Sequence, residues 1–174
     1  MDTLTFGTDG WRDVIAEKFT FENVARAAQA YGDDLLSQNQ TSVLVGHDTR
    51  FLGEQFARHA AEVWAANDLR VLLSNGYIPT PALSYAVKHH SAGGGIMLTA
   101  SHNPPIFHGF KLKGPYGGTA TPDIYKAVSE RVPNISISDV KKFDAKKHSV
   151  ETFDVRGAYY DFLKKQIGLN AIKS

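Results

Sequence analysis

Short apolar runs that alternate with segments of helical periodicity constrain the fold of this chain more than any other feature. The runs lie at residues 43–45, 71–73 and 96–98. Each is continuously apolar, as in a strand that is covered on both faces. The segments between them place apolar residues at helical spacing. The order strand, helix, strand, helix, strand, helix, strand predicts an α/β protein, a three-layer α/β/α fold around a mostly parallel, mixed central sheet.

Local signals predict where the other elements begin and end. Thr20 caps a first helix, and Glu22 lies in its first turn. Three more helix starts and two more strands follow from the same reasoning, and we assign no element to residues 133–152. These predictions are a helix capped by Thr80, a helix capped by Thr121, a helix capped by Asp154 that stops at Gly168, and strands at 3–6 and 110–112.

Length and charge narrow the class of protein. At 174 residues we expect one α/β/α domain over residues 1–150 and a C-terminal helix over residues 151–174, the start of a link to a further domain. Nineteen basic residues against eighteen acidic ones argue against a nucleic-acid or membrane-surface binder. The chain has no cysteine, no apolar signal core and no run long enough to span a bilayer. We expect a soluble, cytoplasmic protein.

The parallel sheet predicts where a ligand binds. Such sheets bind ligands beyond the C-terminal ends of their strands. The loops after residues 45, 73 and 99 therefore open on one edge. That edge would bring together Asp48, Arg50, Ser101 and His102.

Ser101 lies in the loop that follows the last buried run. Pro104 and Pro105 bias the residues before them away from helical backbone, so Ser101 sits on a stiff corner. Ser-His-Asn-Pro is also ordinary turn composition. The loop alone therefore does not establish chemistry.

Hydrolysis and nucleotide binding fit the pattern poorly. Ser101 lacks the Gly-x-Ser-x-Gly elbow, and the adjacent His102 is badly placed for a Ser–His pair. No glycine-rich nucleotide loop follows a strand. A triad with another histidine stays open, although the spacing favours none of the candidates, which are His47, His59, His89, His90, His108 and His148.

Phosphoryl chemistry fits better. A phosphoserine carries close to two negative charges and needs cations beside it. Arg12, Arg50, Lys111 and His102 can supply positive charge at the proposed edge. Phosphoryl transfer asks a protein for positioning and charge stabilisation above all.

Three motifs in this order resemble the α-D-phosphohexomutase family. They are residues 6–12 (Phe-Gly-Thr-Asp-Gly-Trp-Arg), residues 46–50 (Gly-His-Asp-Thr-Arg) and residues 99–104 (Thr-Ala-Ser-His-Asn-Pro) with Gly-Phe-Lys at 109–111. Together they cover most of residues 4–118. The particular residues in these motifs are similar to those of the phosphoglucomutase/phosphomannomutase branch.

The resemblance implies a function for each matching residue. Ser101 matches the serine that is phosphorylated and gives its phosphoryl group to a glucose or mannose 1- or 6-phosphate, through a bisphosphorylated sugar. His102 matches a residue beside the phosphoserine, and Lys111 a lysine proposed to handle the proton of the attacking hydroxyl. Arg12 matches an arginine of the same cleft, whereas we expect Arg50 to support the loop.

Two residues depart from the family pattern, and two aspartates are expected to be structural. His108 stands where the family usually has asparagine, which questions any hydrogen bond inferred there. Asp13 stands where glycine is common, and its carboxylate could weaken the effect of the positive charge of Arg12. For Asp9 and Asp48 we expect turn-capping roles.

The family's metal site is incomplete in this sequence. The resemblance implies Mg²⁺ held by Ser101, or its phosphate, and by three aspartates of a second domain in an Asp-Gly-Asp-Gly-Asp loop. No such segment occurs, and Asp33-Asp34 has the wrong spacing. We therefore expect the first domain of a phosphohexomutase, inactive alone and completed by the remaining domains of the full-length enzyme. The alternative is a non-catalytic module of the same fold that binds a sugar phosphate or a protein.

Overall fold

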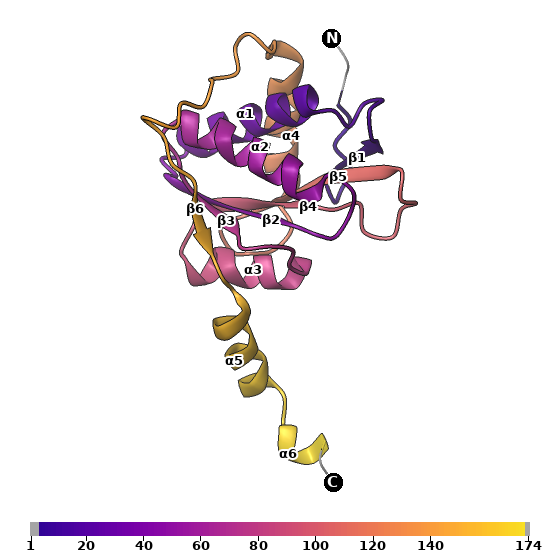
Figure 1. Cartoon of the computed structure of the whole chain (residues 1–174), viewed down its shortest axis with the longest axis vertical. Coiled ribbons are helices and arrows are strands. Elements are labelled where there is room, and N and C mark those ends of the chain that lie inside the picture. Colours follow the sequence, from indigo (N-terminus) through magenta and orange to yellow (C-terminus); the bar gives the residue numbers. More distant parts are fainter. Residues whose placement is uncertain (1–3, 173–174) are drawn as a thin grey trace.

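A six-stranded mixed sheet forms the centre of the computed structural model, which describes residues 4–172 (Figure 1). The strand order is β1-β5-β4-β2-β3-β6. Strands β2, β3, β4 and β6 run parallel to one another, and β5 runs antiparallel to both β4 and β1. The strands are β1 (Trp11–Val14), β2 (Ser42–His47), β3 (Arg70–Ser74), β4 (Gly94–Leu98), β5 (Phe107–Lys113) and β6 (Glu151–Phe153).

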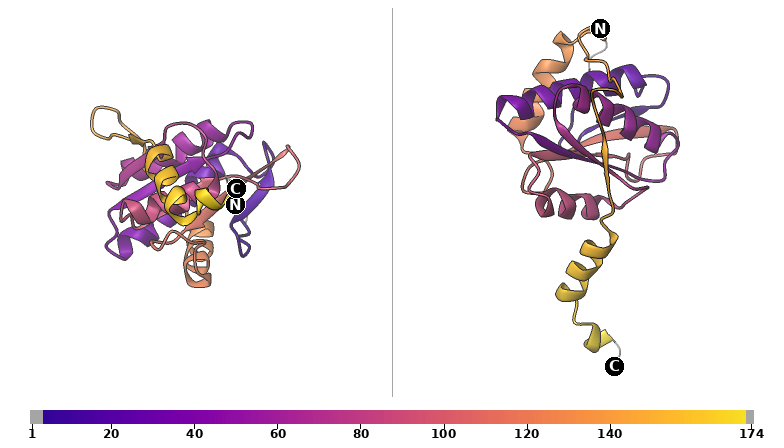
Figure 2. Two further views of the ribbon diagram at one scale, coloured as in Figure 1. Left: turned by 90° about the horizontal axis from the view of Figure 1, so that it is seen from below. Right: turned by 60° about the vertical axis from the view of Figure 1, so that its left-hand side comes forward.

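Helices cover both faces of this sheet, which confirms the predicted three-layer α/β/α fold. Helices α1, α2 and α4 lie on one face and α3 lies on the other (Figure 1). Helix α5 and the short α6 extend away from the sheet on the α3 side (Figure 2). The helices are α1 (Phe21–Ser37), α2 (Gly53–Ala66), α3 (Thr80–His89), α4 (Pro122–Arg131), the 3₁₀ turn η1 (Val132–Asn134), α5 (Arg156–Gln166) and α6 (Leu169–Ile172).

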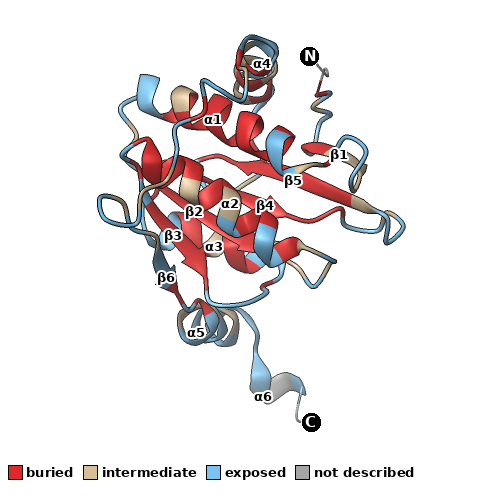
Figure 3. Cartoon of the chain, turned by 45° about the horizontal axis from the view of Figure 1, so that its top comes forward, coloured by how far each residue is buried: buried red, intermediate tan, exposed pale blue. Residues whose placement is uncertain are grey.

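The central strands are buried on both faces, as their continuous apolar runs predict (Figure 3). In β2, Val43 and Val45 belong to the core under α1, α2 and α4, whereas Leu44 belongs to the core under α3. The alternation of side chains along a strand sends neighbours to opposite faces, so a strand between two helical layers must be apolar throughout.

The predicted start of α1 is confirmed in detail. Thr20 has extended backbone, and its Oγ1 accepts a hydrogen bond from the backbone N–H of Asn23 at 3.2 Å. Glu22 lies in the first turn. The buried Trp64 of α2 donates from Nε1 to the Ala28 carbonyl at 2.6 Å, which ties α1 to α2.

Several predicted boundaries are wrong. Residues 4–6 form no strand, and residue 3 lies outside the described residues. The first strand is instead β1 at Trp11–Val14, because these residues pair with β5. Strand β5 is longer than predicted and spans Phe107–Lys113.

The helix starts predicted after α1 are also wrong or incomplete. Pro79 precedes α3, so Thr80 is already helical. Thr121 does precede α4, but its side chain makes no capping hydrogen bond. Val155 precedes α5, which ends at Gln166, although Asp154 Oδ1 accepts a hydrogen bond from the Arg156 N–H.

The segment without a predicted element returns the chain to the sheet. Residues 132–134 form η1, and β6 pairs with β3 at the sheet edge. Arg70 and Glu151 join these strands through two 2.8 Å hydrogen bonds. Helix α5 then contacts α3 through Tyr85, whose ring lies 5.0 Å from that of Phe162. Within residues 4–172, no helix combines the length and the apolar character that crossing a bilayer requires.

Candidate active site

Ser101 is exposed on the loop that follows β4, in a left-handed backbone conformation with φ of 56°. Its N–H donates to Thr99 Oγ1 at 2.9 Å. A left-handed conformation costs a residue with a Cβ atom about 1–2 kcal/mol. The surrounding hydrogen bonds therefore hold Ser101 in a backbone geometry that a free loop would avoid, as is common at functional sites.

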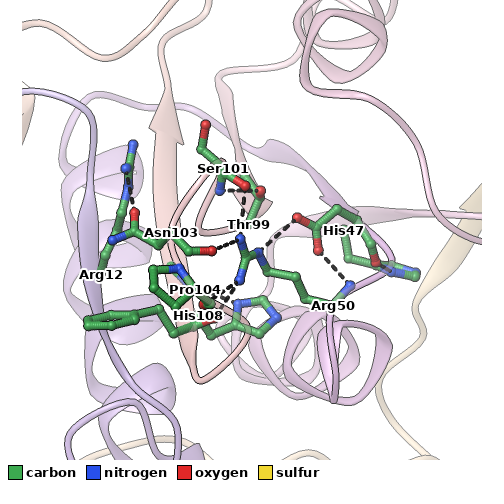
Figure 4. Close-up of polar contacts among 11 residues, drawn as sticks. Arg12, His47, Arg50, Thr99, Ser101, Asn103, Pro104 and His108 are labelled. Carbon is green, nitrogen blue, oxygen red and sulfur yellow. Dashed lines mark hydrogen bonds and ion pairs between the residues drawn. The ribbon is translucent and has the colours of Figure 1, made fainter.

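Arg50 fixes this loop by donating hydrogen bonds to four main-chain carbonyls (Figure 4). Nη2 contacts the Ser101 carbonyl at 2.8 Å and the Asn103 carbonyl at 2.6 Å. Nη1 contacts the carbonyls of Pro104 and Phe107, each at 3.0 Å. The five donors of one planar guanidinium suit this task. The prediction that Arg50 supports the loop is confirmed.

Asp48 orients Arg50. Its Oδ1 accepts a hydrogen bond from the Arg50 backbone N–H at 2.9 Å, and its Oδ2 lies 3.6 Å from Arg50 Nε. The predicted turn-capping role of Asp48 is therefore confirmed.

Arg12 reaches the same loop from β1. Its Nη1 donates to Oδ1 of Asn103 at 2.9 Å (Figure 4). Its Nη2 donates to Oδ2 of Asp9 at 2.9 Å. That same Asp9 oxygen accepts from Nζ of Lys111 at 2.5 Å. One carboxylate oxygen therefore joins the two cations predicted for the site.

The turn-capping role predicted for Asp9 is wrong, because its side chain forms ion pairs with Arg12 and Lys111. The expectation that Asp13 tempers Arg12 is also not met. Asp13 Oδ1 accepts from the Val14 N–H, and successive residues of a strand point to opposite faces. Asp9 is thus the carboxylate that neutralises Arg12.

Arg12 and Lys111 project from the sheet face that carries α3. Lys111 lies opposite Met97, which packs under α3, and Arg12 lies opposite Gly109. Directly paired residues share a face, as do residues two apart on one strand. A Cβ atom on Gly109 would lie 2.4 Å from the Thr99 carbonyl oxygen and 3.0 Å from Cγ of Arg12. Glycine here lets β5, Arg12 and the serine loop approach one another.

His108 lies on the opposite face, fully buried between aromatic rings. Its ring stacks on Phe19 at 4.9 Å and meets Phe56 edge-on at 5.3 Å. Nδ1 accepts a hydrogen bond from the Gly109 N–H at 2.9 Å, so the neutral ring carries its hydrogen on Nε2. Burial lowers the pKa of His108 to about 4. The residue packs beneath the loop instead of entering the site.

His102 is exposed and makes no hydrogen bond or ring contact to any residue that the structure describes. Within the same residues, no histidine nitrogen hydrogen-bonds Ser101, whose N–H and carbonyl are bonded to Thr99 and Arg50. The structure thus places Ser101, Arg12 and Lys111 around one loop and face, with His102 beside them in solvent. It shows no Ser–His pair of the kind a hydrolase triad needs.

The residues present do not by themselves fit a Mg²⁺ site. Mg²⁺ prefers near-octahedral oxygen ligation that includes carboxylates. No three His, Asp or Glu side chains among residues 4–172 are grouped to hold a metal ion. The Asp9 carboxylate is paired with two cations, and Ser101 would supply a single oxygen. We therefore derive no step through a metal ion.

Sequence reasoning missed the roles of two polar residues of this site, Asn103 and Asp9. Asn103 binds Arg12 from the loop itself, and its neighbour Ser101 was the signal that could have identified it. Asp9 acts across 102 positions of sequence, so only the pairing of β1 with β5 reveals it.

Comparisons with known proteins agree with this geometry. Residues 3–138 match the family model of "Phosphoglucomutase/phosphomannomutase, alpha/beta/alpha domain I". The chain is 36% identical to a phosphoglucomutase of Staphylococcus saprophyticus over 140 residues, which are 76% of this chain and 25% of that protein. It is 32% identical to a "Probable phosphoglucosamine mutase" of Pyrococcus furiosus, with 97% of this chain and 39% of that protein covered.

A solved structure shares the fold closely. The crystal structure of a "putative phosphomannomutase" from Thermus thermophilus superposes with a TM-score of 0.88 at 44% identity, covering 98% of this chain and 37% of that chain. The present chain thus spans between a quarter and two fifths of these relatives. The chain belongs to the phosphoglucomutase/phosphomannomutase family and matches its α/β/α domain I.

Proposed function

We propose that Ser101 carries a phosphoryl group in the interconversion of a hexose 1-phosphate and a hexose 6-phosphate. The observation that supports this most is the exposed Ser101 at φ of 56° on a loop fixed by Arg50, with Arg12 bound to the same loop. Phosphoryl transfer needs positioning and charge stabilisation, and this arrangement supplies both.

The chain's cations would compensate the phosphoserine. A phosphate on Ser101 adds close to two negative charges. Arg12 lies next to the loop and now shares its charge with Asp9. We propose that some of the guanidinium N–H groups of Arg12 donate hydrogen bonds to the phosphate oxygens, and that the exposed His102 donates a further one. Arg50 stays on the main chain, since its donors are already bound to four carbonyls.

Transfer exchanges one phosphorus–oxygen bond for another. The bond from Ser101 Oγ to phosphorus breaks as the sugar hydroxyl oxygen bonds to phosphorus, and Ser101 Oγ takes up one proton to become a hydroxyl again. The hydroxyl proton leaves in the same step. Lys111, whose ammonium pairs with Asp9, would hand a proton to the leaving Ser101 Oγ and take up the proton of the attacking hydroxyl, so that it ends the step with the same charge. The bisphosphorylated sugar then reorients and returns its other phosphate to Ser101.

Partners outside this chain complete the proposal. We propose that Mg²⁺ takes one ligand from Ser101 or its phosphate and the rest from further domains of a full-length enzyme. Glucose and mannose phosphates are the proposed substrates. The 174-residue chain alone is then expected to be inactive as a mutase.

Intact mass tests the proposal directly. Protein isolated from cells that also produce the remaining domains is compared with a Ser101→Ala variant. We expect the added mass of one phosphate group in the first and none in the second. Lasting absence of phosphate would favour a non-catalytic module. Sustained glucose 6-phosphate formation by this chain with glucose 1-phosphate, Mg²⁺ and a trace of the bisphosphate would overturn the predicted inactivity.

A further inference from the structure

A single carboxylate oxygen of Asp9 holds both cations of the candidate site. Oδ2 accepts a hydrogen bond from Nη2 of Arg12 at 2.9 Å and one from Nζ of Lys111 at 2.5 Å. Within residues 4–172, neither cation is paired with another carboxylate, and Oδ1 of Asp9 accepts no hydrogen bond. One negative charge is thus shared between two positive charges, so a change at one cation alters the electrostatic environment of the other.

The main chain fixes Asp9 against β5, next to Lys111. Asp9 lies in a tight turn that is closed by a 2.9 Å hydrogen bond from the Gly7 N–H to the Gly10 carbonyl. Gly10 adopts φ of 104°, and a Cβ atom there would lie 2.4 Å from the Phe110 carbonyl oxygen. The turn therefore packs directly on the residue before Lys111, and only glycine permits this approach. The pair of Asp9 and Lys111 is thus fixed by the fold.

Arg12 is the cation of this cluster that can change its partner. Its Nη1 donates to Oδ1 of Asn103 on the serine loop (Figure 4), and its Nη2 contacts Asp9. Both acceptors belong to side chains, whereas Arg50 is bound to four main-chain carbonyls. Asn103 follows Ser101 by two positions, so a phosphate on Ser101 would enter the surroundings of the Arg12 guanidinium. That phosphate offers close to two negative charges and parallel hydrogen bonds, against the single, already shared charge of the carboxylate.

We infer that Asp9 is a positioning residue that keeps Lys111 in place and releases Arg12 to the phosphate when Ser101 is phosphorylated. The inference rests on the proposed function, since it needs a phosphate on Ser101. It goes beyond that function because it makes the proton affinity of Lys111 depend on whether Ser101 carries the phosphate.

The change of partners sets the direction in which Lys111 moves its proton. With the phosphate on Ser101, Arg12 has left and the full charge of Asp9 stabilises the Lys111 ammonium. As the phosphoryl group leaves, Arg12 returns to Asp9 and Lys111 becomes the stronger acid, at the moment when Ser101 Oγ takes up a proton. In the reverse transfer, the affinity of Lys111 for a proton rises as the serine hydroxyl loses one. The change of partners itself neither gains nor loses a proton, because an arginine stays charged throughout.

Further titratable groups surround this cluster. Lys113 lies two residues beyond Lys111 on the same face of β5, and burial, with a smaller effect of Lys111, lowers its pKa. Burial, with a smaller effect of Asp9, raises the pKa of Tyr125 of α4 to about 12. His102 is exposed on the serine loop. Within residues 4–172 none of these groups is hydrogen-bonded to Asp9, so they contribute equally to the chains that test the inference.

NMR titrations of the 174-residue chain test this inference. Phosphoserine is incorporated genetically at position 101, which gives the phosphorylated chain without an enzyme. The pKa values of the Asp9 carboxyl group and of the Lys111 amine are measured with and without the phosphate. The same measurements are made on Arg12→Gln, in which Asp9 has no arginine to lose. Thermal melting verifies that each protein is folded.

We expect phosphorylation to raise both pKa values by about 0.5–1 more in the unaltered chain than in Arg12→Gln. The field of the phosphate acts in both chains, so the difference isolates the departure of Arg12 from Asp9. In the unaltered phosphorylated chain, a scalar coupling between the phosphorus and an Arg12 guanidinium nitrogen reports the new hydrogen bond. Equal rises in the two chains would overturn the inference. Should Arg12→Gln not fold, the coupling decides, and its absence overturns the inference.

Asp9→Asn tests the positioning of Lys111, with Asp13→Asn as the matched control. Both variants change the net charge equally, but Asp13 bonds the Val14 N–H and neither cation. We expect the pKa of Lys111 to fall by about 1 in Asp9→Asn and to change by less than about 0.3 in Asp13→Asn. An equal change in both variants would mean that Asp9 acts through net charge alone and would reject its positioning role.

Intact mass separates the failure of this inference from failure of the proposed function. Ser101 phosphorylated in cells, together with equal pKa rises in the unaltered chain and Arg12→Gln, would reject the Asp9 role alone. The expected pKa difference with incorporated phosphoserine, but no phosphate on Ser101 in protein from cells, would reject the phosphoryl-carrier role alone.

Discussion

Arg50 Nη2 donates a 2.8 Å hydrogen bond to the main-chain carbonyl of Ser101, 51 positions later in the sequence. The side chain comes from the loop between β2 and α2, and the carbonyl from the loop after β4. These strands are parallel neighbours, so their C-terminal ends meet at one sheet edge. The position of the candidate nucleophile therefore depends on one guanidinium.

Replacing Arg50 should loosen the serine loop more than the rest of the fold. Arg50→Ala removes the donors to four carbonyls, and we expect a loss of about 2 kcal/mol in the free energy of unfolding. Hydrogen exchange at residues 101–107 should speed up, with the amides of β2 little changed. The control is Arg58→Ala, which removes an exposed arginine of α2. Equal exchange in both variants would contradict the role of Arg50.

A glycine at position 101 should stabilise the chain while removing the hydroxyl proposed to carry the phosphoryl group. Ser101 is exposed and adopts φ of 56°, which is unfavourable with a Cβ atom and free for glycine. We expect Ser101→Gly to raise the free energy of unfolding by up to about 1 kcal/mol, after the greater freedom of glycine in the unfolded chain is included. Ser101→Ala keeps the Cβ atom and serves as the control. Urea unfolding of the three proteins measures this, and a less stable glycine variant would show that the loop imposes no strain.

Asp9 should compete with a bound phosphate for the positive charges of Arg12 and Lys111. Its carboxylate neutralises Arg12 and Lys111, and Asp9→Asn would release both charges at almost constant shape. We expect inorganic phosphate to bind more tightly to this variant. Stability should fall by less than about 1 kcal/mol, because the Asp9 side chain is 42% exposed and solvent screens its ion pairs.

Asp13→Asn is the matched control for Asp9, since Asp13 bonds the Val14 N–H and neither cation. Both variants change the net charge by the same amount. Phosphate titrations of the two variants at equal ionic strength measure the difference. An equal gain in affinity would mean that net charge alone, and not the Asp9 contact, controls phosphate binding.

The central part of the fold could be predicted from the sequence, whereas the edges of the sheet could not. Residues in runs such as 43–45 are buried on both faces of the sheet, so the continuous apolar sequence alone identifies these strands. Strand β1 reads Trp-Arg-Asp-Val and has no such signal; it is a strand because β5 pairs with it. The short β6 is likewise held at its edge by β3 and by the ion pair between Arg70 and Glu151.

The candidate site was predictable in its residue types and less so in its contacts. Arg50 could be assigned to the loop because both belong to neighbouring C-terminal strand ends. The partner of Asp9 depends on the register of β1 with β5, which local spacing does not encode.

His108 should make stability depend on pH between about 6.5 and 4. The unfolded histidine binds a proton below its ordinary pKa of about 6.5. Burial, partly opposed by Asp48, lowers the folded pKa to about 4. The unfolded state thus binds more protons in this window, so stability is fully present above pH 6.5 and falls by about 3 kcal/mol as the pH drops to 4.

Urea unfolding at several pH values measures the His108 effect against a His108→Asn variant. The variant has a fixed packing loss at every pH, so the slope against pH, and not the absolute stability, is compared. We expect a shallower slope between about pH 4 and 6.5 in the variant. Parallel slopes would show that the buried imidazole does not control this pH dependence.

Gly109 should tolerate no side chain. A Cβ atom would lie 2.4 Å from the Thr99 carbonyl oxygen, which is rigid main chain, and 3.0 Å from Cγ of Arg12. Gly109→Ala must therefore push β5 away from the serine loop, and we expect it to cost about 1–3 kcal/mol in unfolding free energy. Gly157→Ala on α5 is the control, since its Cβ atom meets nothing within 4 Å and alanine favours a helix. Because Arg12 is displaced along with β5, phosphate binding should weaken in Gly109→Ala and stay unchanged in Gly157→Ala. Equal stability of the two variants would show that the close approach of β5, Thr99 and Arg12 is not required.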